Sequence, residues 1–245
     1  MRIVGVIPAR LGSKRLPGKA LVKVAGTEMV LYVYRRARRY RRFDRLLVAT
    51  DDHQIGRLIQ ADGGHVFYSE KPFRNGSERC AAAIANIDCD IIVNVQGDEV
   101  MIESEQIDAA VRLLEADPTL PMATVAFPLT GGLVDHKDRN LVKVAVDVAG
   151  RARDFSRQPI NLKGKEIRSY GHAGIYVYRK EFLLKYAQLP PTPREQAESL
   201  EQLRVLESGF PIGVAIIDKT LLSVNSPEDL KIANQLLRDE GGTVR

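Results

Sequence analysis

The sequence predicts an α/β protein built on a doubly wound, mostly parallel sheet, and three observations support this prediction. Short apolar runs alternate with helical patterns through the first half of the chain. These runs are hydrophobic throughout, which is typical of strands buried on both faces of a parallel sheet. Glycine and polar residues follow directly after several of them. Since ligands collect at the carboxyl ends of parallel strands, we expect a binding site at that edge.

The first half of the chain predicts strands and helices that alternate along the sequence. Proline and glycine forbid regular structure in the loop after the first apolar run. Asp62-Gly63-Gly64 is a helix stop, and Ser104 suits the start of a helix. Such β-α units are joined by right-handed crossovers. We expect strands at residues 3–7, 45–50, 66–68, 90–95 and 122–127, and helices at 29–39, 55–61, 78–87 and 104–115.

The second half has a different pattern, with more polar and turn-forming residues. Two apolar stretches flank Val148-Ala149-Gly150 and predict a hairpin. The final helix has Ser226 as its N-cap, with Asp229 at the third helical position to complete a capping box. No linker divides the chain into independent domains. We expect the hairpin at 143–147 and 151–155, a loop at 159–169, strands at 173–178 and 212–217, and helices at 180–187 and 195–208.

Size and composition indicate a globular protein without a membrane segment. The chain has 245 residues and no apolar run near the ~20 residues that a membrane span needs, and no secretory signal is visible. Cys80 and Cys89 have neither zinc nor redox spacing, so we expect small buried residues in a reducing, cytoplasmic compartment. The net charge is +5, with an arginine run at 35–42. No nucleic-acid motif accompanies this run, so we interpret it as a helix face and expect neither nucleic acid nor membrane as a partner.

A purely cationic loop follows the first predicted strand. No Asp or Glu occurs in residues 1–27, and the loop contains Arg10, Lys14, Arg15 and Lys19. It is not a Walker A motif, because the glycine spacing differs and no hydroxyl residue follows Lys19. A solvated basic turn is one interpretation. Cations gathered without a counter-charge are costly unless an anion joins them, so we favour a polyphosphate site.

Asp98 is the candidate metal ligand. It follows the strand expected at 90–95 through a glycine, and Glu99 is the alternate or supporting acid. A carboxylate at the carboxyl end of a strand, across from a cationic loop, suits a Mg²⁺ ion that bridges phosphate oxygens. A solvated turn acid is the other interpretation of this position. Together with the basic loop and the α/β order, Asp98 predicts an enzyme that uses a nucleoside triphosphate.

Several motifs resemble those of the sugar-activating cytidylyltransferases, and most closely the CMP-Kdo synthetase (3-deoxy-manno-octulosonate cytidylyltransferase) family. They span nearly the whole chain in the family's order and lie at residues 7–21, 48–52, 75–79, 93–99, 155–157, 172–176 and 198–204. The resemblance implies a nucleotide-diphospho-sugar transferase-like fold with a smaller β-rich lobe for sugar binding and dimerisation. Within a single 1–245 domain it implies that 1–130 mainly bind nucleotide, 131–225 mainly bind acid sugar and dimerise, and 226–245 form the C-terminal helix.

The resemblance also implies a reaction. The anomeric hydroxyl of an acid sugar, 3-deoxy-D-manno-octulosonate (Kdo), attacks the α-phosphorus of CTP and gives a CMP-sugar and pyrophosphate for lipopolysaccharide or capsule biosynthesis. Mg²⁺ is the implied cofactor and a homodimer the implied assembly. The implied catalytic residues are Arg10, Arg15, Lys19 and Asp98, and the implied metal ligands are Asp98 and Asn225.

The resemblance assigns binding residues for both substrates. For the sugar carboxylate, Arg157 offers a planar fork of donors. The implied nucleotide-binding residues are Pro8, Ala9, Arg10, Leu11, Gly12, Ser13, Arg15, Lys19, Gly76, Ser77, Arg79, Gln96 and Gly97. The implied sugar-binding residues are Arg157, His172, Tyr176, Glu201 and Gln202. From the residues alone, His172 also fits a hydrogen-bonded core histidine, and Glu201-Gln202 an exposed helix face.

The chain departs from the family pattern on the metal and sugar side. Asn225 stands where the family has a metal-binding aspartate, and it offers one neutral oxygen without charge. Val100 replaces a usual proline, and Arg153-Asp154 replaces a usual Leu-Tyr pair. A related acceptor, such as an amino-substituted Kdo, another keto-acid sugar or a phosphonate, is therefore an alternative. A glycosyltransferase and a non-catalytic protein that binds nucleotide or nucleic acid are further alternatives.

Overall fold

A computed structural model describes residues 1–13, 15–129, 138–160 and 166–239. The chain forms two compact units. Unit 1 consists of residues 1–104 together with 222–245, and unit 2 consists of residues 105–221. Unit 1 is therefore built from both ends of the chain. The functional division expected at residues 130 and 225 concerns substrate binding and stays a prediction.

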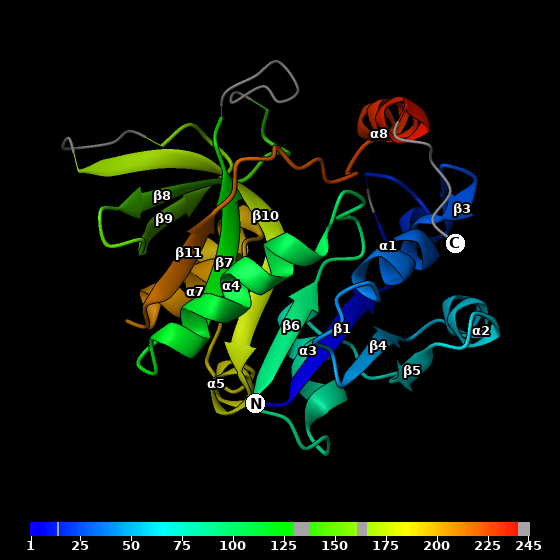
Figure 1. Cartoon of the computed structure of the whole chain (residues 1–245), viewed down its shortest axis with the longest axis horizontal. Helices are drawn as coiled ribbons and strands as arrows, with labels where there is room; N and C mark the ends of the chain where they lie inside the picture. Colours follow the sequence, from blue (N-terminus) through cyan, green and yellow to red (C-terminus); the bar gives the residue numbers. More distant parts are fainter. Residues whose placement is uncertain (14, 130–137, 161–165, 240–245) are drawn as a thin grey trace. The chain divides into compact units, whose positions relative to one another are not determined.

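Unit 1 contains a parallel sheet with the strand order β6-β1-β4-β5 (Figure 1). Val6 of β1 pairs with Leu47 of β4 on one side and with Asn94 of β6 on the other. The apolar side chains of β1 are almost wholly buried, as the hydrophobic run predicted. The predicted parallel sheet is confirmed in this unit. Its strands are β1 (Ile3–Ala9), β4 (Arg45–Thr50), β5 (His65–Tyr68) and β6 (Ile91–Val95).

Side-chain caps begin two of the helices of unit 1. Asp52 Oδ1 accepts hydrogen bonds from the N–H groups of Gln54 (2.8 Å) and Ile55 (2.9 Å), and Asn75 Oδ1 accepts one from the N–H of Glu78 (2.9 Å). These caps satisfy backbone donors that have no partner within the helix. The predicted helices are found, with ends shifted by a few residues. The elements are α1 (Met29–Ala37), α2 (His53–Ala61), α3 (Gly76–Ile84), the short 3-10 helix η1 (Lys19–Leu21), β2 (Lys23–Val24) and β3 (Thr27–Glu28).

The last helix, α8 (Pro227–Asp239), belongs to unit 1 and has the predicted capping box. The N–H of Asp229 donates to Ser226 Oγ (3.1 Å), and the N–H of Ser226 donates to the Asp229 carboxylate (2.9 Å). The N–H of Ala25 donates to Asn234 Oδ1 (2.8 Å). This bond ties α8 to the turn between β2 and β3, so the end of the chain packs on its beginning.

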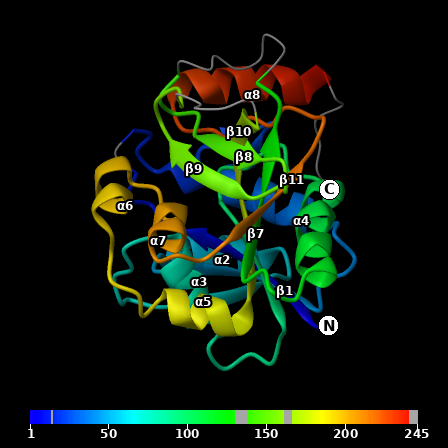
Figure 2. The same ribbon diagram turned by 90° about the vertical axis from the view of Figure 1, so that its left-hand side faces the viewer.

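Unit 2 contains a mixed sheet (Figure 2). β11 runs parallel to β7, β10 runs antiparallel to it, and β8 pairs with both β10 and β9. A bulge interrupts β10 between Ala173 and Tyr176. The predicted hairpin is confirmed as β8 and β9. The strands are β7 (Met122–Phe127), β8 (Lys143–Asp147), β9 (Ala152–Ser156), β10 (Ile167–Arg179) and β11 (Ile212–Ile216).

β10 is longer than the sequence predicted. Residues 167–169, which we expected in a loop, are part of the strand, because Ile167 pairs with Asp147 and Ser169 with Ala145 of β8. The expectation was wrong here, since pairing with a neighbouring strand supplies hydrogen bonds that the local composition does not reveal. Residues 161–165 of the expected loop lie outside the described residues.

The helix expected at 195–208 is in fact two helices, separated at Ser199. This residue has φ 53° and ψ 51°, a left-handed conformation that ends α6. Arg157, which follows β9, donates from Nε to the carbonyl of Glu198 (2.8 Å). A carbonyl at the end of α6 thus has its partner outside the helix, which is why one continuous helix was the wrong prediction. The helices of unit 2 are α4 (Ser104–Ala116), α5 (Lys180–Tyr186), α6 (Pro193–Glu198) and α7 (Gln202–Glu207).

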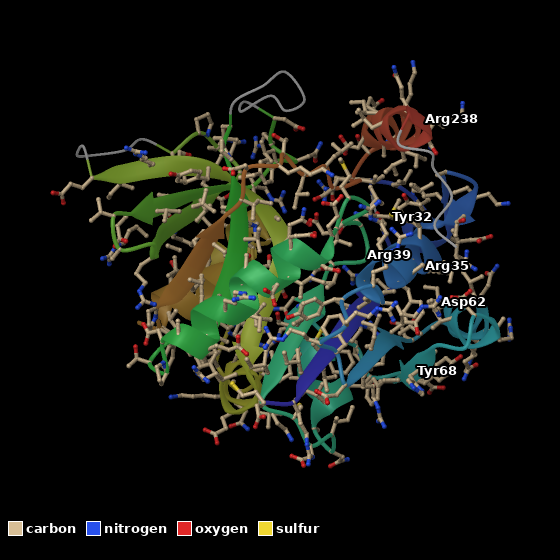
Figure 3. All side chains as sticks on the ribbon, viewed as in Figure 1. Tyr32, Arg35, Arg39, Asp62, Tyr68 and Arg238 are labelled. Atoms are coloured by element: carbon tan, nitrogen blue, oxygen red, sulfur yellow. The ribbon has the colours of Figure 1, made fainter. Side chains whose placement is uncertain are left out.

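The arginine run of α1 is partly engaged within the protein. Arg35 donates from Nη2 to Asp62 Oδ1 (2.6 Å) (Figure 3). Arg36 is buried, with Nε donating to the carbonyl of Ile102 (2.8 Å) and Nη2 to Glu103 Oε1 (3.2 Å). Only the start of the run lies on the predicted helix, because α1 ends at Ala37 and the residues from Arg38 onward follow it. Arg35 and Arg36 are held by internal partners and are not simply a solvated face.

Two remaining sequence expectations concern cysteine and the membrane. Cys80 lies on α3, and both Cys80 and Cys89 are free thiols with buried side chains, as expected. Within the described residues, no helix has the length and apolar character needed to cross a membrane.

Candidate active site

The cationic loop begins where β1 ends, at Ala9. Gly18 has φ +65°, a left-handed conformation that favours glycine, and η1 starts directly after it. Ser13 Oγ accepts a hydrogen bond from the N–H of Leu16 (3.3 Å), which stabilises the turn between these two residues. The described residues of the loop thus include a side-chain-stabilised turn and end in a short helical turn.

The charged side chains of this loop differ in exposure. Arg10 and Arg15 are exposed, whereas Lys19, on η1, is largely buried, with 18% of its side chain accessible. Lys14, predicted to join them, lies outside the described residues. The guanidinium groups of Arg10 and Arg15 are accessible from solvent, and Lys19 is directed to partners within unit 1.

Lys19, Asp98, Asn225 and Arg15 form one cluster in unit 1. Lys19 Nζ pairs with the Asp98 carboxylate and also donates to Asn225 Oδ1 (3.1 Å). Arg15 Nη2 donates to the same Oδ1 (3.0 Å). Asp98 comes from the loop after β6, and Asn225 comes from the segment before α8. Asp98 and Asn225 are far apart in sequence, and each thus places an oxygen atom next to the ammonium group of Lys19.

Asp98 and Glu99 have different surroundings, which separates their roles. The Asp98 carbonyl accepts a hydrogen bond from the N–H of Val224 (3.1 Å), which fixes the loop, and its carboxylate faces Lys19. Glu99 is buried, and its Oε1 accepts a hydrogen bond from Ser223 Oγ (2.5 Å). Since Ser223 holds Glu99, the geometry favours Asp98 as the candidate metal ligand and gives Glu99 a supporting role.

The predicted nucleotide-binding residues outside the loop lie close together at the carboxyl ends of β1 and β6. A Cβ atom on Gly76 would come within 2.8 Å of Gln96 Nε2 and 3.1 Å of Pro8 Cγ, so only glycine fits there without a shift. Gln96 Nε2 donates to Asn94 Oδ1 (3.1 Å), and Asn94 Nδ2 donates to Ser77 Oγ (3.2 Å). This chain of amides and a hydroxyl fixes Gln96. Gly97 also lies here, as a Cβ atom on it would be 3.3 Å from the Pro8 carbonyl.

Arg79, on α3, is a buried cation at the same edge of the sheet. Its Nη2 donates to Asp51 Oδ2 (2.9 Å), at the end of β4, and its guanidinium lies 5.2 Å from the ring centre of Phe73. Its Nη1 is buried and has no hydrogen-bond partner in the described part of the chain. A buried unpaired donor is costly, so Arg79 has spare capacity to bind a ligand acceptor.

Three predicted sugar-binding residues lie together in unit 2. The rings of His172 and Tyr176 are 5.4 Å apart, and Tyr176 Oη donates to Gln202 Oε1 (3.2 Å). Burial lowers the pKa of His172 to about 3, so the ring is neutral near pH 7. Gln202 is buried, and its Nε2 has no hydrogen-bond partner among the residues described. This amide is a second buried donor with capacity for a ligand.

Arg157 and Glu201, also predicted to bind sugar, are fixed by backbone contacts. Arg157 Nη1 donates to the Arg139 carbonyl (3.2 Å), in addition to the bond from Nε to Glu198. Tyr186 Oη donates to the carbonyl of Glu201 (3.2 Å). Nearby, Lys143 Nζ donates to the carbonyl of Arg157 (3.1 Å). The guanidinium fork of Arg157 is thus directed largely at carbonyl oxygens in this form of the protein.

Sequence reasoning missed several residues that hold the candidates. Thr124 contacts His172, Asp51 pairs with Arg79, and Ser223 holds Glu99. One signal was available for Thr124, a hydroxyl residue within an otherwise apolar strand, because a buried hydroxyl needs a partner. For Ser223 the sequence contains no such signal, since its partner lies 124 positions away.

The fold and the site define a class of protein: an α/β nucleotidyltransferase, in which a basic loop after β1 faces an acid after β6. One solved structure, a CMP:2-keto-3-deoxy-manno-octonic acid synthetase complexed with CTP, has a TM-score of 0.88 and 35% identity, over 98% of this chain and 100% of that one. A putative glucose-1-phosphate thymidylyltransferase from Bacillus anthracis shares the fold, with a TM-score of 0.69 at 18% identity over 97% of this chain and 96% of that one.

Sequence comparison identifies the family. The model of a family described as Cytidylyltransferase matches residues 4–219. A 3-deoxy-manno-octulosonate cytidylyltransferase from Syntrophotalea carbinolica is 42% identical over 94% of this chain and 96% of that protein. A second, from Geobacter metallireducens, is 42% identical over 97% of this chain and 99% of that protein. The chain belongs to the 3-deoxy-manno-octulosonate cytidylyltransferase family.

Proposed function

We propose that the protein is a 3-deoxy-manno-octulosonate cytidylyltransferase, which transfers CMP from CTP to Kdo and releases pyrophosphate. The single observation that carries this proposal is the 42% identity, over 94% of the chain, to a relative with that activity. The pairing of Lys19 with Asp98 supports it, because a cation at the end of the loop after β1 and an acid after the neighbouring β6 suit a magnesium nucleotide. Lipopolysaccharide biosynthesis is the use that the family implies for CMP-Kdo.

Unit 1 carries the residues that we assign to CTP. Arg10, Arg15 and Lys19 would neutralise the triphosphate, with Ser13 and the neighbouring backbone of residues 8–12 shaping the loop around it. The spare donor of Arg79 and the fixed amide of Gln96 suit acceptors of the nucleoside. Gly76, Ser77 and Gly97 complete this set.

The donor set around Lys19 fits a divalent cation. Asp98 and Asn225 already share one positive group, the Lys19 ammonium, so their oxygens converge on a single point. No group of three or more His, Cys, Asp or Glu gathers as a metal site in the described residues. Mg²⁺ needs only one or two protein oxygens when a triphosphate supplies others. When bound there by Asp98 and Asn225, it would neutralise charge on the phosphates and orient them.

Unit 2 carries the residues that we assign to the sugar. The unpartnered amide donor of Gln202 and the ring of His172 are polar groups in an otherwise apolar setting, which suits a polyhydroxylated acid. Tyr176 orients Gln202 through its hydroxyl group. We keep Arg157 and Glu201 in this set, with Arg157 as the partner of the sugar carboxylate. The homodimer remains a prediction from the family resemblance, and the cytoplasmic location remains a prediction from the cysteine usage and the rest of the sequence.

The chemistry requires mainly position and charge from this chain. The oxygen of the anomeric hydroxyl forms a bond to the α-phosphorus of CTP and gives up its proton to solvent, while the bond to the pyrophosphate oxygen breaks and its electron pair leaves with pyrophosphate. Lys19 and Arg15 would stabilise the charge that develops on the α-phosphate and on pyrophosphate. Such preorganised donors contribute about 3 kcal/mol or more each when they act on the transition state.

The test is pyrophosphate release from CTP and Mg²⁺ across a panel of acid sugars, which includes Kdo, an amino-substituted Kdo and a phosphonate. We expect turnover with Kdo and loss of about a thousandfold or more for Asp98→Ala, with an unchanged circular dichroism spectrum. Asp88→Ala removes an exposed carboxylate of the same unit and is the matched control. Near-normal activity of Asp98→Ala would remove this residue from the mechanism, and release of a nucleoside phosphate from a preformed donor would indicate a glycosyltransferase.

A further inference from the structure

Thr124 is a buried hydroxyl residue that joins two groups of β10. It lies on β7 and is fully inaccessible to solvent. Its Oγ1 donates a hydrogen bond to the carbonyl oxygen of Ile175 (2.7 Å) and lies 2.9 Å from Nε2 of His172. Both partners come from the part of β10 that carries the candidate sugar-binding residues.

The bulge in β10 and the pairing before it explain why Thr124 makes these contacts. Ala173 pairs with Val125 and Tyr176 pairs with Thr124, so two residues of β10, at positions 174 and 175, have no counterpart on β7. A bulge leaves backbone groups outside the regular ladder. The hydroxyl of Thr124 satisfies one of them, the carbonyl of Ile175. His172 pairs with Ala126, two positions from Thr124 on β7, so its side chain lies on the same face and reaches the oxygen of that hydroxyl.

These two distances fix which nitrogen of His172 carries hydrogen. A carbonyl oxygen only accepts, so the single hydrogen of the Thr124 hydroxyl is committed to Ile175. The Thr124 oxygen then offers only lone pairs, and the contact with Nε2 requires an N–H there. Burial keeps the imidazole neutral by lowering its pKa to about 3, so it has one N–H only. Nδ1 therefore carries a lone pair.

The contacts of the ring leave Nδ1 available. The edge of the His172 ring meets the Phe155 ring, with centres 5.1 Å apart, and the tilted ring of Tyr176 lies 5.4 Å away. Among the described residues, the only hydrogen-bond partner of the imidazole is Thr124. An acceptor that has no hydrogen bond within the described part of the protein is open to a donor from a ligand or from water.

We propose that Thr124 is a positioning residue for the acid sugar: its hydroxyl holds His172 in the Nε2–H tautomer, so that Nδ1 presents an acceptor to a hydroxyl group of the sugar. This inference rests on the proposed function, because the sugar is the ligand whose hydroxyl groups would donate. Toward the sugar, His172 is then a hydrogen-bond acceptor through Nδ1, while its Nε2–H group donates to Thr124. It also selects for a sugar that carries a hydroxyl at the matching position, because an analogue without that hydroxyl would leave Nδ1 unpaired.

The first experiment measures the tautomer itself. Long-range 1H–15N correlation spectra of the substrate-free, 15N-labelled full chain distinguish the two neutral tautomers, and His172→Gln assigns the signals among the four histidines. We expect the wild-type ring to be Nε2–H. An Nδ1–H ring in the wild-type protein would overturn the proposal, even if a Thr124 variant failed to fold.

In Thr124→Val, which keeps the branched shape, we expect the Nδ1–H form to become populated, whereas Thr124→Ser keeps the wild-type pattern. A pure Nε2–H ring in Thr124→Val would also overturn it.

The second experiment connects the tautomer to the sugar. We expect Thr124→Val to raise the KM for Kdo about tenfold and leave the KM for CTP unchanged, with Thr124→Ser within about twofold of the wild type. An unchanged KM for Kdo in Thr124→Val, or an equal rise for both substrates, would overturn the role in positioning. If the wild-type enzyme released no pyrophosphate with any acid sugar, the proposed function would fail. The spectra would still decide the tautomer on their own.

Discussion

Asn225 contributes an uncharged oxygen to the cluster around Lys19. Its Oδ1 accepts from Lys19 and Arg15, and the carboxylate of Asp98 pairs with Lys19. An amide oxygen can coordinate a metal, but it has no charge and does not offset the repulsion between that metal and a neighbouring ammonium group. The cluster therefore favours an anionic nucleotide over a free divalent cation, and the metal is expected to arrive with the triphosphate.

We predict that Asn225→Asp lowers the Mg²⁺ concentration needed for half-maximal rate, by roughly threefold to tenfold, while CTP binding stays unchanged. A carboxylate at this position attracts the metal through a full charge. The measurement is a Mg²⁺ titration of the pyrophosphate release rate, with CTP affinity measured separately by calorimetry. Gln54→Glu adds the same charge on an exposed position of α2 and is the matched control. A midpoint that does not move in Asn225→Asp would refute the assignment of Asn225 as a ligand.

We predict that the free energy of unfolding falls at acid pH because His172 is buried. Burial lowers its pKa from 6.5 to about 3 in the folded protein, so below about pH 6.5 the unfolded chain binds a proton that the folded chain does not. The stability that depends on a neutral His172 is fully present above about pH 6.5 and is lost progressively as the pH falls toward about 3. At about pH 5 the loss amounts to roughly 2 kcal/mol.

The measurement is the free energy of unfolding from urea titrations at about pH 5 and about pH 7, on the wild-type protein and on His172→Gln. Glutamine keeps an N–H donor for Thr124 and does not titrate. We expect the variant to lose less stability on acidification than the wild type, by roughly 2 kcal/mol. Equal losses in the two proteins would show that His172 is readily protonated in the folded state.

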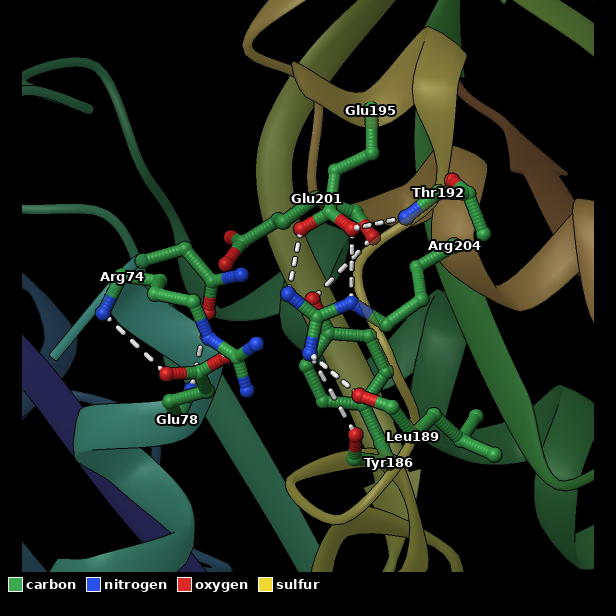
Figure 4. Close-up of polar contacts among 9 residues, drawn as sticks. Arg74, Glu78, Tyr186, Leu189, Thr192, Glu195, Glu201 and Arg204 are labelled. Carbon is green, nitrogen blue, oxygen red and sulfur yellow. Dashed lines mark hydrogen bonds and ion pairs between the residues drawn. The ribbon is translucent and has the colours of Figure 1, made fainter.

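At the scale of elements, a buried ion pair joins the helices that follow β10. Arg204 of α7 is fully buried and donates from Nε (2.7 Å) and Nη2 (2.5 Å) to the two carboxylate oxygens of Glu195 on α6 (Figure 4). Its guanidinium also lies 4.6 Å from the ring centre of Tyr186, the last residue of α5. One side chain thus connects three helices, and next to α7 lies the predicted sugar residue Glu201.

We predict that Arg204→Met lowers the free energy of unfolding by about 3–5 kcal/mol, because it leaves the buried Glu195 carboxylate without its charged partner. Arg204→Met combined with Glu195→Leu is expected to recover most of this loss, since it removes the unpaired charge as well. Chemical denaturation of the three proteins measures these differences. A loss below about 1 kcal/mol in the single variant would indicate that water or a neighbouring group replaces the arginine.

The same elements show where the sequence is informative and where it is not. The strand at 45–50 and the capping box at Ser226 were predicted correctly, because apolar runs and caps are encoded by adjacent residues. The break at Ser199 was missed, because residues 195–208 are rich in good helix formers and the partner of the Glu198 carbonyl, Arg157, lies about 40 positions earlier. Contacts distant in sequence, such as Lys19 with Asp98, followed only from the parallel topology.

At the scale of the whole molecule, the residues assigned to the two substrates fall in different units. Those assigned to CTP, from Pro8 to Gln96 and Gly97, belong to unit 1, and those assigned to the sugar, from Arg157 to Gln202, belong to unit 2. The family resemblance implied this division, with the nucleotide-binding residues in the first half of the chain and the sugar-binding residues in the second. The return of residues 222–245 to unit 1, which brings Asn225 to Lys19, was implied only by the assignment of Asn225 as a metal ligand.

This separation predicts that variants of one unit affect one substrate. We expect Gln202→Met to raise the KM for Kdo about tenfold and to leave CTP binding unchanged, because it removes a buried amide donor without a partner in the described residues. Lys19→Met is expected to weaken CTP binding in the absence of sugar. Calorimetry with CTP and initial rates against Kdo measure both effects. Gln106→Met, which changes another buried glutamine of unit 2 on α4, is the matched control and should leave both unchanged. A loss of CTP affinity in Gln202→Met would show that the two sets of residues do not act independently.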